Sequence, residues 1–329
     1  MVIKGNKLVE VSYSSFFKKT LINLRFDLHV IPTTFDPPWH SDHGWLLKLP
    51  DIEFKKNTLL LLHFQDFVTF QDGRIVELDR VAKHYGENAN QILVTHMHPG
   101  LDQVYHGPVN LIEFSSHNYR EILVTRNCWP DWRHIAEHAK TRPWQCLNGR
   151  KCPHRQWAVN ILSDWGNGII SYGTDIPLPE WHISQLEGRE NCDNFIGLGG
   201  VYSKCAVNIV TETLYDPVPG LFSEKTLHAL FAQQIPIVIG SQGLVSSVRA
   251  HGFDMFDDIV DTSYDSLPNE TRLPQALELN RDLIQGRIDL APYQERLRAQ
   301  REFVLDDYPN LMELRFIQDC KQLASKLNF

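Results

Sequence analysis

Residues 202–243 read YSKCAVNIVTETLYDPVPGLFSEKTLHALFAQQIPIVIGSQG, and this stretch decides the fold. The run 205–210 is short, apolar and rich in β-branched residues, which is typical of a buried strand. The segment 215–222 contains the turn formers Pro and Gly, and Ser223 is a good N-cap for the helix that follows. A second buried strand is expected at 235–239. A strand, a helix and a strand of these lengths form a βαβ unit of a parallel sheet.

Ligands of parallel sheets bind beyond the carboxyl ends of the strands. The pattern collects polar and charged residues at that edge: Glu212, Ser223, Glu224, Lys225 and Ser241. A helix N-terminus beside a Lys is a natural site for a phosphate or diphosphate. An ordinary buried βαβ unit is the alternative, because a Glu in the first helical turn favours the helix dipole and a Lys there is commonly solvated.

A second strand, loop and helix lies at 144–173, WQCLNGRKCPHRQWAVNILSDWGNGIISYG. The spacing of its apolar residues predicts a helix over 155–165 between two short strands at 145–147 and 169–172. Cationic residues again open the helix, and the guanidinium of Arg155 offers a planar fork for two phosphate oxygens. Arg150 is a further candidate, and a solvated turn is the ordinary alternative.

The stretch 202–243 resembles the donor-binding motif of the α1,3-fucosyltransferase family. That family has an acidic residue after a strand, a hydroxyl-Glu-Lys triplet that opens a helix, and a strand of the type I-P-V-V-x-G. The counterparts here are Glu212, the triplet Ser223, Glu224 and Lys225, and residues 235–240. Two family Asn residues are replaced, one by Thr211 or Thr213 and one by His228.

The segment 144–173 is similar to a second motif of the same family. There, an Asn and then an Arg precede a helix, and the following strand ends in an aromatic residue and Gly. The counterparts are Asn148, Arg155 and Tyr172. The resemblance covers roughly residues 144–265 and nothing before them.

The resemblance implies an α/β fold in which two Rossmann-like domains face each other across a cleft, the GT-B type. It implies an acceptor-side domain at 1–135, a nucleotide-sugar domain at 136–290 and C-terminal helices at 291–329 that pack back on the first domain. The activity implied is an inverting, metal-independent transfer from a GDP- or UDP-linked sugar to a hydroxyl of a glycan or another acceptor. No cofactor beyond this donor is expected. The sequence contains no Asp-x-Asp, which agrees with cationic side chains in place of a metal ion.

Several short apolar runs in the first 135 residues predict buried strands of an irregular doubly wound domain. These runs are 26–31, 58–64, 91–95, 110–114 and 121–125. Apolar residues at helical spacing predict a helix over 77–85. A polar helix over 131–142 is expected to connect the domains.

Titratable residues follow two of these strands. Asp66, Asp102 and His98 are candidates for the base that deprotonates the acceptor hydroxyl. Helix capping by the Asp residues and burial of the His are the ordinary alternatives. His96 and His98 also suggest a metal-dependent hydrolase of the β-lactamase type. That pattern is incomplete, because the Asp and His positions that should follow hold Gly and Leu.

Composition and charge restrict the partners and the cellular compartment that we expect for the protein. A formal net charge of −8 disfavours DNA as a partner, although a phage-type transferase that glycosylates a DNA base remains an alternative. A non-catalytic nucleotide-sugar-binding protein is another. No run is apolar enough for a membrane span. The N-terminal residues lack the apolar region of a signal peptide, and the six Cys lack disulfide spacing. We therefore expect a reduced, cytoplasmic protein.

The strings GFDMFDD at 252–258 and SYD at 263–265 are like segments in relatives of these transferases. Asp257 and Asp258 are candidates for sugar contacts, but helix capping or a surface position is favoured. Residues 270–327 are expected to be mostly helical.

Overall fold

The computed structural model of the chain describes residues 27–31, 54, 58–63, 70–71, 74–96, 101, 105–115, 118–119, 121–123, 125–126, 140–149, 151–172, 200–213, 215 and 222–326. The protein is mixed α/β with parallel sheets, as predicted. It divides into two compact units: Met1–Arg120 with Asn310–Phe329, and Glu121–Pro309. The predicted domain boundaries at 135 and 290 and the facing Rossmann-like arrangement stay predictions.

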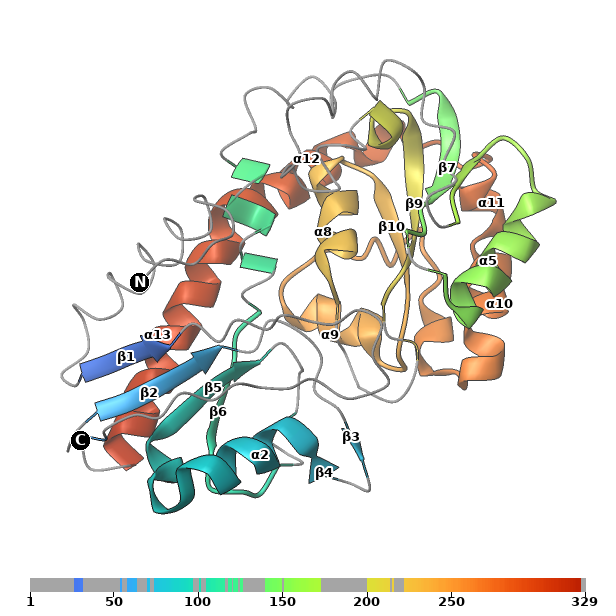
Figure 1. The fold of residues 1–329 in the computed structure, drawn as a ribbon. Coiled ribbons are helices and arrows are strands. Elements are labelled where there is room, and N and C mark those ends of the chain that lie inside the picture. The colour runs from blue at the N-terminus through green and yellow to red at the C-terminus, as the bar shows by residue number, and fades with distance from the viewer. Residues whose placement is uncertain are drawn as a thin grey trace, which may run out of the picture. The chain divides into compact units, whose positions relative to one another are not determined.

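The first unit contains a four-stranded parallel sheet in the order β1-β2-β5-β6 (Figure 1). Its strands are β1 (Asp27–Ile31), β2 (Thr58–His63), β5 (Ile92–His96) and β6 (Asn110–Glu113). A two-stranded antiparallel ladder precedes β5, formed by β3 (Phe70–Gln71) and β4 (Arg74–Ile75). The four strands of the parallel sheet fall on four of the five predicted runs.

Helix α2 (Val76–Tyr85) and the 3₁₀ turn η1 (Gly86–Gln91) connect this ladder to β5. Leu78, Val81 and Tyr85 lie three and four residues apart, so they share one face of α2, and all three are buried. The helix ends at Gly86, whose φ of 53° lies in the left-handed region that Gly adopts readily.

The predicted strand over 121–125 is wrong, because 121–123 and 125–126 are helical. The run EILVT is short, apolar and β-branched, and periodicity alone cannot distinguish such a strand from a turn of buried helix. The predicted polar helix over 131–142 is wrong at its end, where Arg142 begins a strand. Its residues 131–139 lie outside the described residues.

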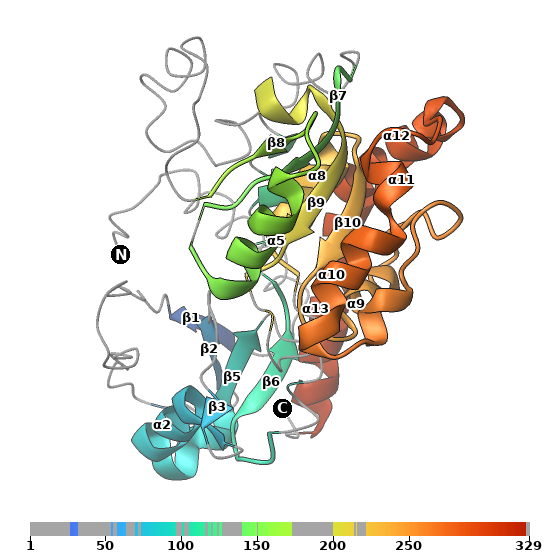
Figure 2. The same ribbon diagram turned by 90° about the vertical axis from the view of Figure 1, so that its right-hand side faces the viewer.

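The second unit contains a four-stranded parallel sheet in the order β10-β9-β7-β8 (Figure 2). Its strands are β7 (Arg142–Cys146), β8 (Ile169–Ile170), β9 (Cys205–Thr211) and β10 (Ile235–Ile239). Helix α5 (Pro153–Ser163) connects β7 to β8, and helix α8 (Glu224–Phe231) connects β9 to β10. Both predicted βαβ units are therefore present. Figure 1 shows α8 on one face of the sheet and α5 with α10 on the other.

The strand order of this sheet reverses between β7 and β9. The chain passes from β7 to β8 on one side, and then returns to place β9 and β10 on the other side of β7. Helices α5 and α8, which follow β7 and β9, lie on opposite faces of the sheet (Figure 1). In open α/β sheets, this arrangement forms the crevice where ligands bind.

Buried amides fix the pairing of β7 with β9. Gln234 Oε1 accepts from Asn208 Nδ2 at 2.9 Å and from Gln145 Nε2 at 3.2 Å. Gln234 Nε2 donates to the carbonyls of Tyr202 and Cys205, both at 2.9 Å. Because an unsatisfied buried amide is costly, this network favours one register of the two strands.

The C-terminal part is mostly helical, as predicted. It contains α9 (Leu244–Ala250), η2 (Ser263–Ser266), α10 (Asn269–Leu279), α11 (Arg281–Ile284), η3 (Ala291–Tyr293), α12 (Gln294–Glu302), the π-helical η4 (Phe303–Asp307) and α13 (Tyr308–Lys326). On α13, the ring of Phe316 lies 5.2 Å from that of Phe114, and Glu313 accepts a hydrogen bond from Tyr119. None of the helices among the described residues has both the length and the apolar character of a membrane span.

Candidate functional site

Glu212 is the buried anchor of the N-terminus of α8. The carboxylate follows β9 and is 1% exposed. Its Oε1 accepts from the Ser223 N–H at 3.0 Å and from Thr226 Oγ1 at 2.7 Å, while its Oε2 accepts from Ser223 Oγ at 2.6 Å and from the Thr213 N–H at 3.3 Å. Both carboxylate oxygens are thus occupied by the chain around the start of α8. A carboxylate in this position also favours the helix dipole.

Ser223 is the N-cap of α8, as the sequence predicts. It has an extended backbone, and its hydroxyl accepts from the Lys225 N–H at 3.3 Å. Because Ser223 Oγ also donates to Glu212, one hydroxyl joins the cap to the anchor. The first turn of α8 therefore begins at the carboxyl edge of the sheet, directly after this cap.

Lys225 and Glu224 form an ion pair at this N-terminus. Lys225 Nζ lies 2.5 Å from Glu224 Oε1, 3.2 Å from Ser223 Oγ and 3.3 Å from Thr213 Oγ1. The side chains remain 28% and 15% exposed, respectively. The ammonium group is therefore held near the helix N-terminus and is still accessible to solvent.

Asn148 and Arg155 bring the end of β7 to the end of β9. Asn148 Oδ1 accepts a hydrogen bond from Thr211 Oγ1, and its backbone N–H donates to Ser171 Oγ at 2.8 Å. Arg155, in the first turn of α5, is 2% exposed and donates from Nη2 to the Thr211 carbonyl at 3.0 Å. The guanidinium thus holds the end of β9 and is largely shielded from solvent.

A stack of three side chains crosses the same edge. His154 lies 4.9 Å from the ring of Tyr215 with an interplanar angle of 7°, and the Arg272 guanidinium lies 5.3 Å from that ring. His154 Nε2 is 2.9 Å from the Glu212 carbonyl, which only accepts, so Nε2 carries the proton. Arg272 Nη1 donates to the Gly240 carbonyl at the end of β10 at 2.6 Å. The stack therefore links the ends of β7, β9 and β10.

The sequence did not identify Tyr215 and Arg272 as part of this site. Tyr215 precedes a Pro-rich loop and has no local signal, and Arg272 is on α10, 57 positions further along the chain. Their contact depends on how α10 packs, which no local pattern reveals.

The remaining residues that were predicted to bind the donor nucleotide differ in their surroundings. Tyr172 is half-buried, with Lys151 Nζ 5.7 Å from its ring centroid. Ser241 is buried, and its hydroxyl has no hydrogen-bond partner within the described part of the chain. Arg150 lies outside the described residues, as do all three candidates for the base, Asp66, Asp102 and His98.

No group of three metal-ligating side chains occurs within the residues that the structure describes. His96 ends β5 and is buried, whereas His98 is among the residues not described. Near the end of β7, burial raises the pKa of the Cys146 thiol to about 11. In the absence of a metal ion, that thiol is therefore neutral at pH 7.

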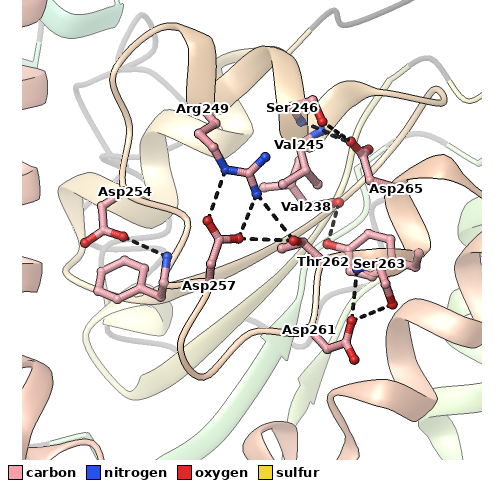
Figure 3. A network of polar contacts seen from close by, with 12 residues as sticks. Val238, Val245, Ser246, Arg249, Asp254, Asp257, Asp261, Thr262, Ser263 and Asp265 are labelled. Atoms are coloured by element: carbon pink, nitrogen blue, oxygen red, sulfur yellow. Dashed lines mark hydrogen bonds and ion pairs between the residues drawn. The ribbon is translucent and has the colours of Figure 1, made fainter.

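The string at 252–265 forms a polar framework behind the end of β10 (Figure 3). Asp257 accepts two hydrogen bonds from the guanidinium of Arg249, at 2.7 and 3.0 Å, and these bonds lower its pKa. Asp265 accepts from the Val245 and Ser246 N–H groups, at 2.9 and 3.0 Å, and so caps α9. These Asp side chains fix the loop after β10 and the start of α9.

Comparison of the chain with protein-family models, curated proteins and solved structures found no match.

Proposed function

We propose that the protein transfers a sugar from a nucleotide-diphosphate sugar to an acceptor hydroxyl, and that the second unit binds the donor. The observation that carries this proposal is that the segments that open α5 and α8 meet where the strand order reverses. Contacts of Asn148 with Thr211 and of His154 with Glu212 join the two segments. Nucleotides bind at this position in open α/β sheets.

The N-terminus of α8 is the proposed seat of the diphosphate. Its N–H groups carry partial positive charge, and the ammonium group of Lys225 adds a full one. A phosphate oxygen would replace Glu224 as the partner of Lys225. This exchange costs little, because a partly exposed ion pair contributes only about 0–1 kcal/mol. Glu224 is then released to accept hydrogen bonds from ribose or sugar hydroxyls.

Arg155 and Glu212 are proposed as positioning residues rather than direct ligands. The Arg155 guanidinium donates to the Thr211 carbonyl, and the Glu212 carboxylate is bonded on both oxygens. Their contacts hold the end of β9 and the start of α8 in fixed relation. Preorganised donors of this kind stabilise a developing charge without reorganising during the reaction.

In the proposed transfer, the acceptor oxygen attacks the anomeric carbon while a base takes its proton. The bond from the anomeric carbon to the phosphate oxygen breaks, and the nucleoside diphosphate leaves with the electron pair. Lys225 and the N-terminus of α8 stabilise the negative charge that develops on it. Asp66, Asp102 and His98 remain the proposed bases. Inversion, metal independence and a GDP or UDP donor are proposed from the fucosyltransferase resemblance.

A thermal-unfolding screen with GDP, UDP, CDP, dTDP and their sugars tests donor binding. A ligand at 100 times its dissociation constant adds about 2.7 kcal/mol, which raises the midpoint of a unit of this size by roughly 5–10 °C. Lys225→Ala should abolish the shift, whereas Lys326→Ala, which removes an exposed Lys at the end of α13, should keep it. Failure of every nucleotide to shift the protein would contradict the proposal.

Transfer is tested separately, with the nucleotide that binds and a panel of hydroxyl acceptors. Release of the nucleoside diphosphate that depends on the acceptor supports an enzyme. Binding without release, with acceptor or water, supports the non-catalytic sugar-nucleotide-binding alternative instead.

A further inference from the structure

A second candidate site lies at the opposite, amino-terminal edge of the same sheet. An open pocket of about 1220 Å³ is lined there by the starts of β7 and β9, by residues 285–291 and by α12. It is larger than the roughly 300–1,000 Å³ of most small-molecule sites. The switch-point site, in contrast, lies beyond the carboxyl ends of these strands. The two sites therefore share no lining residue.

The pocket is strongly basic in a protein whose net charge is −8. Asp289 is the one acidic residue among its lining side chains. The cationic lining residues are Lys140, Arg142, Arg287, Arg298 and Arg301. These cationic residues are far apart in the sequence, since Lys140 and Arg301 are 161 positions apart. The fold therefore brings the positive charges together.

Three of the five cations have no carboxylate partner among the described residues. Among the described residues, Lys140, Arg142 and Arg298 form no ion pair, while Arg287 pairs with Asp282 at 2.6 Å. Lys140 Nζ donates to the carbonyls of Ala232, at 2.9 Å, and Tyr202, at 3.4 Å. Burial of this ammonium group without a carboxylate lowers its pKa to about 8. An anion in the pocket would relieve that cost.

We propose that this pocket binds a small molecule that carries two or more phosphate groups. Guanidinium groups bind phosphate oxygens through two parallel hydrogen bonds. The lining includes four Arg, of which Arg142 and Arg298 are exposed and form no ion pair with the described residues. Its volume exceeds that of a single phosphate, and several cations in one concave site favour a polyanion over a monoanion. Apolar side chains in the lining, Pro143, Ile288, Leu290 and Leu297, would contact the uncharged part of the ligand.

The proposal is independent of the donor site, and the test separates them by using Lys225→Ala protein. Inorganic pyrophosphate is titrated into this variant by calorimetry at constant ionic strength, with inorganic phosphate in parallel. Pyrophosphate should bind, and bind more tightly than phosphate. Arg142→Gln with Arg298→Gln, added to Lys225→Ala, should weaken pyrophosphate binding at least about tenfold, because each charge-assisted hydrogen bond contributes strongly to affinity.

Both substituted Arg side chains are exposed, so the variants should keep their unfolding midpoints. Arg315→Gln is the matched control, since it removes one exposed guanidinium from α13, outside the pocket, and should leave the affinity unchanged. The proposal is overturned if Lys225→Ala protein does not bind pyrophosphate. It is also overturned if the double Arg substitution and the Arg315→Gln control have the same affinity.

Discussion

Replacement of Glu212 by Ala is expected to destabilise the second unit strongly. The substitution leaves three close, buried donors without their acceptor: the Ser223 N–H, the Ser223 hydroxyl and the Thr226 hydroxyl, at 2.6–3.0 Å. Each buried donor left unsatisfied costs about 1–3 kcal/mol. Contributions within one network do not add fully, so we expect a total loss of about 3–5 kcal/mol.

The loss is measured by urea unfolding followed by circular dichroism. With a slope of about 2 kcal/mol per molar urea, a loss of about 4 kcal/mol lowers the midpoint by roughly 2 M. Glu212→Gln keeps the shape and one carbonyl oxygen but directs an amide group at two donors, so its midpoint should lie between those of Glu212→Ala and the unsubstituted protein. The matched control is Glu302→Gln, which removes an exposed carboxylate from the end of α12 and should change stability by less than about 0.5 kcal/mol.

This experiment separates an anchor from a ligand-binding carboxylate. If the Glu212 carboxylate acts as an anchor, both Glu212 variants should lose stability in the absence of any ligand. Equal midpoints for Glu212→Ala and Glu302→Gln would refute the reasoning, because the carboxylate would then not hold the start of α8.

Three further predictions concern single residues of the second unit. Tyr215→Phe should lower the free energy of unfolding, measured in urea, by about 1–3 kcal/mol. The substitution removes a hydroxyl that donates to the Asn269 carbonyl at 2.7 Å and accepts from the Leu273 N–H at 3.1 Å at the start of α10. An unchanged free energy of unfolding would show that the stack does not depend on these bonds. Lys140 has a pKa of about 8 in the folded protein and an ordinary value of 10.5, so between these values its side chain holds more protons in the unfolded chain. The contribution of Lys140 to the free energy of unfolding should therefore rise from pH 8 to 10.5, by on the order of 3 kcal/mol. The buried thiol of Cys205 has the opposite effect, because its pKa rises from an ordinary value of about 9 to about 12 in the folded protein, so the assignment is tested by the difference between the two proteins. Urea titrations across the range should show that Lys140→Met lacks the Lys140 contribution; the same pH dependence in both proteins would contradict the assignment. Gly168→Ala should lower the midpoint of thermal unfolding, because the new Cβ would lie 2.1 Å from the buried Trp144 ring. We expect a loss of about 1–3 kcal/mol in stability. Gly149→Ala is the control, since its Cβ meets open space, and equal effects of the two substitutions would contradict this packing.

The parallel sheet of the second unit could be predicted because its signals are local. The strand Ile235–Ile239 has the predicted bounds, since an apolar run of five residues between polar turns has few other solutions. Helix α8 begins directly after the predicted N-cap Ser223. The helical residues 121–123 and 125–126 are not predictable from the sequence, because a short apolar run lacks the periodic pattern that distinguishes a helix from a strand.

The candidate site was predictable only in part. Glu212, Ser223 and Lys225 are close in sequence and can be predicted together, but the hydrogen bonds on Glu212 depend on where Ser223 and Thr226 lie relative to the end of β9. Arg155 was interpreted as a phosphate ligand, while its bond to the Thr211 carbonyl depends on the pairing of β7 with β9. The basic pocket had no sequence signal, because its cations lie on separate elements.

Binding of the nucleoside diphosphate at Lys225 is the central claim, and calorimetry tests it most directly. The affinities of the nucleoside diphosphate and of its nucleoside are compared in the unsubstituted protein and in Lys225→Ala. The account predicts that the substitution weakens diphosphate binding at least about tenfold, through loss of a charge-assisted hydrogen bond, and leaves the nucleoside affinity unchanged. Equal affinities of the two proteins for the diphosphate would contradict it.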